Sequence, residues 1–355
     1  MPTVKENEQF LRSLHTPGHS AGPAFHATPY DKPPGPYSLL EGDFTTAARP
    51  MADWVDYLAR LYEHGVAYQA AIQDDTVPLA SLWTGTQVYA AAFGAPAHFY
   101  PNMPPAARPI FFSGEEADRA IEPDAENCPL VQKTLELAEL LRKRLGQNVF
   151  FSPIDVQTGF DTAALLWDKT SFYTALADPE EQPAVERLVH KCGNFLKAVL
   201  AALRREIPTM SPQHCPGAWS PPEMGPWVSN DECGAMSAEM FERFCLPELI
   251  DLANRFGGLG MHCCADQERH YPAFAKIPGF YGFNGKKELT YHSGPAVRYF
   301  GHANGPIIAV GALRDQEVED MLNAAPEGAR FQITLDALPI DQARERHDRL
   351  MQRYR

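Results

Sequence analysis

Short apolar runs alternate with longer amphipathic stretches along most of this chain. The runs that read as strands lie at 66–73, 149–154, 226–230, 257–264, 280–284, 306–311 and 330–335. Helical spacing of apolar residues occurs at 51–64, 130–146, 183–206, 237–256, 315–324 and 339–354. A repeated strand–helix order favours parallel strands covered by helices, and about eight such units close into a barrel. We therefore predict an α/β fold, a single (β/α)8 TIM-type barrel.

A doubly wound open sheet is the structural alternative. It is less favoured because the dinucleotide-binding motif G-x-G-x-x-G does not follow the first strand.

Of the 32 prolines, 17 lie in three segments, 17–37, 96–109 and 208–226. Segments this rich in Pro and Gly form ordered loops or surface arms. We expect residues 1–50 to be an N-terminal Pro/Gly-rich arm packed on a barrel that spans 51–355.

The composition restricts the classes of partner. The formal net charge is −14 and no run is rich in Lys or Arg, which argues against nucleic acid and against an anionic membrane surface. The first ten residues, MPTVKENEQF, are not a secretory signal, and no stretch approaches the ~18 apolar residues of a membrane span. Seven scattered cysteines do not make a disulfide framework. We expect a cytoplasmic protein that acts on a small molecule.

The run 257–264 reads GGLGMHCC and ends in a histidine and two cysteines. Because side chains alternate across a strand, His262 and Cys264 share one face and Cys263 lies on the other. We expect His262 and Cys264 to face inward at the carboxyl end of the strand, where barrel enzymes keep their active sites. Such a pair can supply two zinc ligands. The alternative is a histidine and a cysteine that only pack or form one hydrogen bond.

Carboxylates follow several other predicted strands. Asp231 follows 226–230 and is expected to orient substrate or act as a general base, with Asp155 and Asp75 as weaker catalytic candidates. Asp336 follows 330–335 and faces inward by the same alternation, so it is the expected third metal ligand, with Asp231 and Glu232 as the next candidates. A helix cap for Asp231 and a surface position for Asp336 are the alternatives.

Amides and aromatic rings complete the expected pocket. Asn284 and Asn230 end two predicted strands, and Trp83 and Trp219 lie in the neighbouring loops. We expect these four residues to bind substrate, with loop packing as the alternative for each tryptophan.

The segment WVSNDECGAMSAEMFERFCLPELIDLANRFGGLGMHCC resembles the uroporphyrinogen decarboxylase superfamily. There, an S-x-D-like strand end is followed by S-x-x-x-F-x-x-F-x-x-P, a helix and an H-x-C or H-x-G strand end. The likeness extends through 74–95, 152–167 and the strand IPGFYGFN, and covers most of the chain beyond residue 50. It implies the same (β/α)8 barrel and one of at least two chemistries.

Decarboxylation of uroporphyrinogen needs basic residues for a polycarboxylate and an N-terminal R-Q-A-G-R signature. This chain lacks that motif, and segment 17–37 has no arginine, so we do not expect that reaction. The second chemistry is that of the methylcobamide:coenzyme M methyltransferases, in which zinc sits on H-x-C and a later cysteine. The resemblance implies metal-assisted methyl transfer from a corrinoid or other donor to a small acceptor, with His262 and Cys264 as zinc ligands.

The chain departs from that pattern, because Cys264 is its last cysteine. Asp336 is the expected substitute for the missing ligand. No corrinoid-binding D-x-H-x-x-G motif is present, so a corrinoid donor would be carried by a separate protein. A homodimer is the assembly common to this likeness. Two alternatives stay open: a metal-free decarboxylase or lyase, and a catalytically inactive barrel that binds a small ligand.

Overall fold

The computed structural model describes residues 3–19, 21–31, 43–45, 49–100, 103–285 and 294–355. Six parallel strands form one sheet in the order β1-β10-β9-β8-β7-β6, and β2 and β5 form a second parallel pair. These strands are β1 (Ala24–His26), β2 (Leu79–Ser81), β5 (Phe150–Ser152), β6 (Trp227–Ser229), β7 (Leu259–His262), β8 (Phe280–Asn284), β9 (Ile307–Leu313) and β10 (Phe331–Leu335). The short strands β3 (Ala97–His98) and β4 (Ala106–Ala107) pair with each other.

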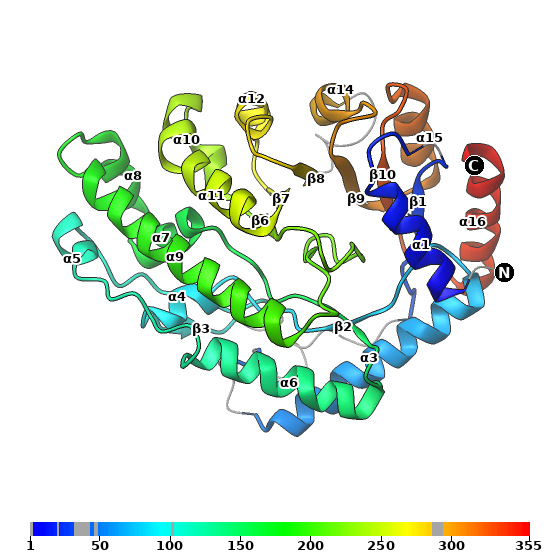
Figure 1. The fold of residues 1–355 in the computed structure, drawn as a ribbon, viewed down its shortest axis with the longest axis horizontal. Helices are drawn as coiled ribbons and strands as arrows, with labels where there is room; N and C mark the ends of the chain where they lie inside the picture. The colour runs from blue at the N-terminus through cyan, green and yellow to red at the C-terminus, as the bar shows by residue number, and fades with distance from the viewer. Residues whose placement is uncertain (1–2, 20, 32–42, 46–48, 101–102, 286–293) are drawn as a thin grey trace.

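Helices lie outside the strands and follow them along the chain (Figure 1). The longer ones are α1 (Val4–Leu14), α3 (Met51–Ile72), α6 (Pro129–Leu145), α7 (Gly159–Leu166), α8 (Lys169–Ala177), α9 (Gln182–Glu206), α11 (Leu246–Phe256), α15 (Asp315–Ala324) and α16 (Ile340–Tyr354). The shorter ones include α4 (Val88–Ala92), α5 (Gly114–Asp118), α10 (Ala238–Phe244), α12 (Tyr271–Phe274) and α14 (Pro295–Phe300). The main hydrophobic core lies between these helices and the sheet.

The parallel sheet confirms the expected α/β class, and most predicted elements occur within a few residues of their expected bounds. The strand expected at 66–73 is wrong, because α3 continues to Ile72. Tyr68 and Ile72 are buried four residues apart, which is the spacing of one helical face. The helix expected at 237–256 is two helices that meet at Cys245, where Pro247 enters the first turn of α11.

The two sheets contact each other at two places. Gln157, beyond β5, forms an isolated parallel bridge with Ser229 of β6, and the Asp75 amide donates to the Phe25 carbonyl of β1 at 3.2 Å. The N-terminal segment therefore does more than cover the sheet, because β1 is its edge strand beside β10. Residues 1–2, 20, 32–42 and 46–48 of the expected arm lie outside the described residues, and the boundary at residue 50 stays a prediction.

The Pro-rich segment 208–226, here called the central loop, runs between the two sheets (Figure 1, lime green in the middle of the view). Gln332 of β10 donates from Nε2 to the Trp219 carbonyl at 3.0 Å, and His214 pairs with Ser229 of β6. Trp219 itself packs on Phe150 of β5, with ring centroids 5.6 Å apart. The loop thus contacts strands on opposite sides of the interior and is largely buried.

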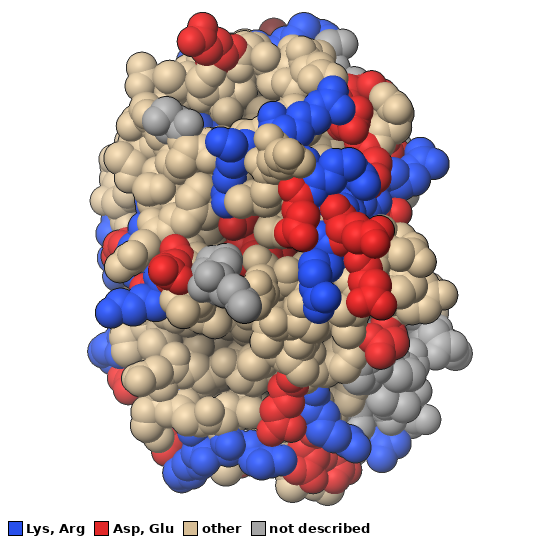
Figure 2. Space-filling view, turned by 90° about the vertical axis from the view of Figure 1, so that its right-hand side faces the viewer, with Lys and Arg blue, Asp and Glu red and all other residues tan. Residues whose placement is uncertain are grey.

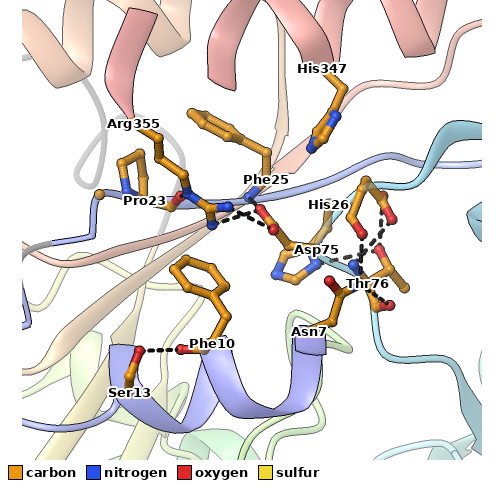
Figure 3. A network of polar contacts seen from close by, with 12 residues as sticks. Asn7, Phe10, Ser13, Pro23, Phe25, His26, Asp75, Thr76, His347 and Arg355 are labelled. Atoms are coloured by element: carbon orange, nitrogen blue, oxygen red, sulfur yellow. Dashed lines mark hydrogen bonds and ion pairs between the residues drawn. The ribbon is translucent and has the colours of Figure 1, made fainter. Parts of the chain in front are cut away.

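A buried ion pair ties the two ends of the chain to the sheet (Figure 3). Asp75 accepts two hydrogen bonds from the Arg355 guanidinium at 2.9 Å and the backbone amide of Phe25 at 2.8 Å, and Arg355 Nε donates to the Pro23 carbonyl at 3.1 Å. The Arg355 guanidinium lies over the Phe10 ring of α1, 3.6 Å from its centroid. The side chains of Arg355 and Asp75 are only 16% and 6% exposed, so this contact links α1, β1 and the end of α16 in a weakly solvated place.

Acidic and basic side chains are interspersed on the face shown in Figure 2. Ion pairs such as Arg349–Asp315 and Arg353–Glu319 link α16 to α15. None of the helices in the described part of the chain combines the length and apolarity needed to cross a membrane.

Replacement of Asp75 by Ala should lower the free energy of unfolding by about 3 kcal/mol, because Arg355 would keep a poorly solvated charge without its partner. The matched control is Arg119→Ala, whose ion pair with Glu115 is 70% and 80% exposed. That change should stay within about 0.5 kcal/mol of wild type. Urea unfolding followed by circular dichroism measures both, and equal effects would contradict the anchoring role.

Candidate metal centre

Asp231, His262 and Cys264 bring one ligand atom each to within 4.8 Å of one another. His262 is the last residue of β7, Cys264 follows it by two, and Asp231 follows β6. Ser229 and His262 are register partners in the parallel β6–β7 pair, so both strands end at the same edge of the sheet. The expected convergence of polar side chains at this carboxyl edge therefore occurs for these three residues.

Asn284 fixes the orientation of the His262 ring. The Asn284 amide donates from Nδ2 to the Ala309 carbonyl at 2.6 Å, which directs its Oδ1 toward His262 Nδ1 at 2.5 Å. This contact places a proton on Nδ1 and leaves the lone pair of the ring on Nε2. Cys264 Sγ lies 2.9 Å from this Nε2 and Asp231 Oδ1 lies 3.9 Å from it. An amide oxygen behind a histidine is a typical support for a metal ligand.

Buried Asp161 holds the chain on which Asp231 lies. Its carboxylate, in the first turn of α7, accepts the backbone amides of Asp231 at 2.6 Å and Glu232 at 3.1 Å. Burial raises the pKa of Asp161 well above its usual value, and the charge of Asp231 adds to this shift. Asp231 Oδ1 in turn accepts the Cys264 amide at 2.5 Å, which joins the ends of β6 and β7.

The central loop brings a second thiol to this group. Cys215 Sγ lies 3.7 Å from His262 Nε2, and Cys215 is partly buried whereas Cys264 is exposed. Burial raises the pKa of each thiol to about 12. The charge of Cys264 further raises the pKa of Cys215, and the charge of Asp231 further raises the pKa of Cys264. Sequence reasoning missed Cys215, because it ends no predicted strand and lies in a segment taken for a loop or surface arm.

Asp155 and His214 lie next to the group. Asp155 is buried, accepts Gln157 Nε2 at 2.5 Å and lies 3.9 Å from His214 Nε2. Burial raises the pKa of Asp155 to about 7, and the charge of Asp231 adds to the shift. Burial lowers the pKa of His214 to about 3, so this imidazole is neutral in its contact with Ser229 Oγ at 2.9 Å. Asp155 is therefore a buried carboxyl that titrates near neutral pH.

The indole of Trp227 forms a floor beneath the group. A Cβ added to Gly260 or Gly282 would lie 2.1 Å or 2.0 Å from this ring. Gly260 is the register partner of Trp227 and shares its strand face with His262. The glycines in β7 and β8 thus make room for a large ring between the strands.

Three expected site residues lie elsewhere. The Asp336 carboxylate pairs with Arg346 of α16 at 2.6 Å; Asp336 lies one residue beyond the end of β10, where the alternation of the strand no longer fixes its direction. Asp75 precedes β2 and is held by Arg355 at the opposite edge of the sheet. The Asn230 side chain lies beside the Cys245 thiol on the helix-facing side, since it alternates with inward Ser229.

Cys263 is fully buried with its Sγ 3.6 Å from Cys233, which confirms its expected place in the helix packing. Asn284 is at the site as expected, but in contact with His262. Trp83 lines a cavity of about 390 Å³ that reaches His214, and Trp219 lines another of about 320 Å³ beside His26. Leu61, Leu79 and Gly217 line both cavities, and the described lining residues include no Asp, Glu, Lys or Arg.

No protein-family model matches the chain, and no curated protein sequence matches it either. Among solved structures, a methyltransferase from Methanosarcina mazei aligns with a TM-score of 0.65 over 99% of both chains, at 13% sequence identity. The two proteins share a fold. At this identity the match carries no residue roles from one chain to the other.

Gly260→Ala should destabilise the protein by about 1–3 kcal/mol, because the new Cβ overlaps the Trp227 ring and strains the strand that carries His262. Gly65→Ala in α3 is the matched control, since its Cβ would meet nothing within 4 Å. That control should stabilise the helix by about 0.5–1 kcal/mol. Thermal unfolding of the two variants compares them, and a neutral Gly260→Ala would contradict the close packing.

Proposed function

We propose that this chain is a metal-dependent enzyme that transfers a methyl or similar one-carbon group from a corrinoid or other donor to a small acceptor. The observation that carries the proposal is the lone pair of His262 Nε2, which Asn284 fixes and which faces a thiol and a carboxylate. The fold shared with a methyltransferase supports methyl transfer as the class of reaction.

We further infer that the two sheets together are the eight strands of one TIM-type barrel. The strands β1, β2, β5 and β6 to β10 follow one another in chain order, and contacts at Gln157–Ser229 and Asp75–Phe25 lie at the two seams. In this reading the metal group lies at the carboxyl rim, the usual place for the active site of such a barrel.

The donor set fits zinc. Imidazole nitrogen, thiolate sulfur and carboxylate oxygen are its usual ligands, and three protein ligands leave one position open. In the described structure Asp231, rather than Asp336, is the carboxylate beside His262 and Cys264. A zinc ion would supply the positive charge that stabilises the anionic, nucleophilic form of an acceptor such as a thiol.

The remaining residues bind the acceptor and handle its proton. In the transfer, the acceptor loses a proton, its lone pair bonds to the methyl carbon, and the donor leaves with the electrons of the broken bond. Asp155, with a pKa raised to about 7, is suited to hold that proton at a carboxylate oxygen. The described residues that line the cavities beside Trp83 and Trp219 include no Asp, Glu, Lys or Arg, which favours a small molecule without a strong charge. We also propose that a separate corrinoid protein carries the methyl donor and that the chain forms a homodimer.

Protein purified without chelator should contain about one zinc per chain, measured by mass spectrometry of the metal. His262→Ala should lose most of this metal, and Asn284→Ala should weaken zinc affinity about 10–100-fold by releasing the ring. The control is Asp336→Ala, a carboxylate change outside the group, which should keep the metal. Full activity with no metal in the wild type would instead favour a metal-free decarboxylase or lyase.

A further inference from the structure

We propose that Cys215 is a further ligand of this metal centre and takes the place of the cysteine that the chain lacks after Cys264. The inference rests on the proposed metal site and extends its ligand set to the central loop. It makes that loop part of the active site, although its sequence shows no metal-binding spacing.

The geometry around His262 Nε2 carries the inference. A tetrahedral zinc with Zn–N of ~2.0 Å and Zn–S of ~2.3 Å separates the two ligand atoms by about 3.5 Å. Cys215 Sγ lies 3.7 Å from Nε2, close to that separation. Cys264 Sγ and Asp231 Oδ1 approach the same nitrogen at 2.9 and 3.9 Å. Three ligand atoms therefore approach the His262 Nε2 lone pair, and with Nε2 the set has four atoms of three chemical types. Asp231, His262 and Cys264 lie within 4.8 Å of one another, and Cys215 joins them through its contact with His262.

Hydrogen bonds on both sides of Cys215 hold the loop tip in place. His214 pairs with Ser229 Oγ at 2.9 Å, and Gln213 donates to the Pro216 carbonyl at 3.0 Å. The Ser220 hydroxyl donates to Gln213 Oε1 at 2.7 Å, and Gln213 and Ser220 are fully buried. Because these contacts fix the neighbours of Cys215, they hold its thiol beside His262 Nε2.

The four ligands differ in their access to solvent. Cys264 is exposed and the Asp231 side chain is 34% exposed, whereas the His262 side chain is 10% exposed and Cys215 is partly buried. Two thiolates and an imidazole are a soft ligand set typical of zinc, and the carboxylate is the hardest of the four. We therefore expect Cys215, Cys264 and His262 to retain the metal, and Asp231 to be the ligand on the acceptor side.

Cobalt(II) added to metal-free protein tests this set, because thiolate-to-cobalt absorption in the near ultraviolet grows with the number of thiolate ligands. Cys215→Ser and Cys264→Ser should each lose about half of the wild-type absorption and bind zinc at least about 10-fold more weakly. Cys128→Ser is the control, since that thiol is bonded to the Ala125 carbonyl away from the site. Cys215→His should regain zinc affinity without regaining the absorption, which separates a lost ligand from a misfolded loop.

Two results would overturn the role of Cys215. One is full absorption and zinc affinity in folded Cys215→Ser, and the other is a Cys215–Cys264 disulfide in freshly purified protein. If Cys215→Ser keeps the metal while His262→Ala and Cys264→Ser lose it, the proposed metal site stands without Cys215. Failure of the wild type to bind either metal would overturn the proposed function as well.

Discussion

The parallel pairing of β6, β7 and β8 is the constraint on which the site depends. Ser229, His262 and Asn284 are register partners across these three strands, so their side chains form one row at the end of the sheet. Within this row Asn284 contacts the ring of His262, and at its other end Ser229 contacts His214 of the central loop. A slip of one residue in either ladder would turn His262 toward the helices and remove the row.

The other half of the site comes from segments outside the strands. Asp161 fixes the turn that carries Asp231, and the central loop places Cys215 from the opposite side. The row of strand-end side chains thus faces the turn that carries Asp231 and the central loop that carries Cys215. The proposed ligands come from both the sheet and the loop inside it. The wide spacing of these residues in the chain explains why no short motif describes the complete group.

The titratable groups around Asp231 hold their protons more strongly than usual. Two thiols with pKa values raised to about 12 and a carboxyl with a pKa raised to about 7 lie around Asp231. Burial disfavours their anionic forms, and their charges add to one another. A divalent ion bound as proposed would displace the thiol protons and stabilise the deprotonated ligands.

The sequence alone determined the features that depend on local alternation. Helical and strand periodicity predicted the α/β class, and the two-residue spacing of His262 and Cys264 placed them on one face with Cys263 on the other. The position of Asp231 after β6 and of Asn284 at the end of β8 also followed from strand ends. These inferences succeeded because a regular strand fixes each side chain relative to its neighbours.

The tertiary structure decided what depended on distant segments. Asp336 lies beyond the end of β10 and pairs with Arg346, and Arg355 retained Asp75 at the other edge. Cys215 reached His262 only because residues 208–226 fold into the interior, an outcome set by hydrogen bonds to strands far along the chain. Alternation along one strand cannot specify such contacts, since they depend on how the strands of both sheets pack around the central loop.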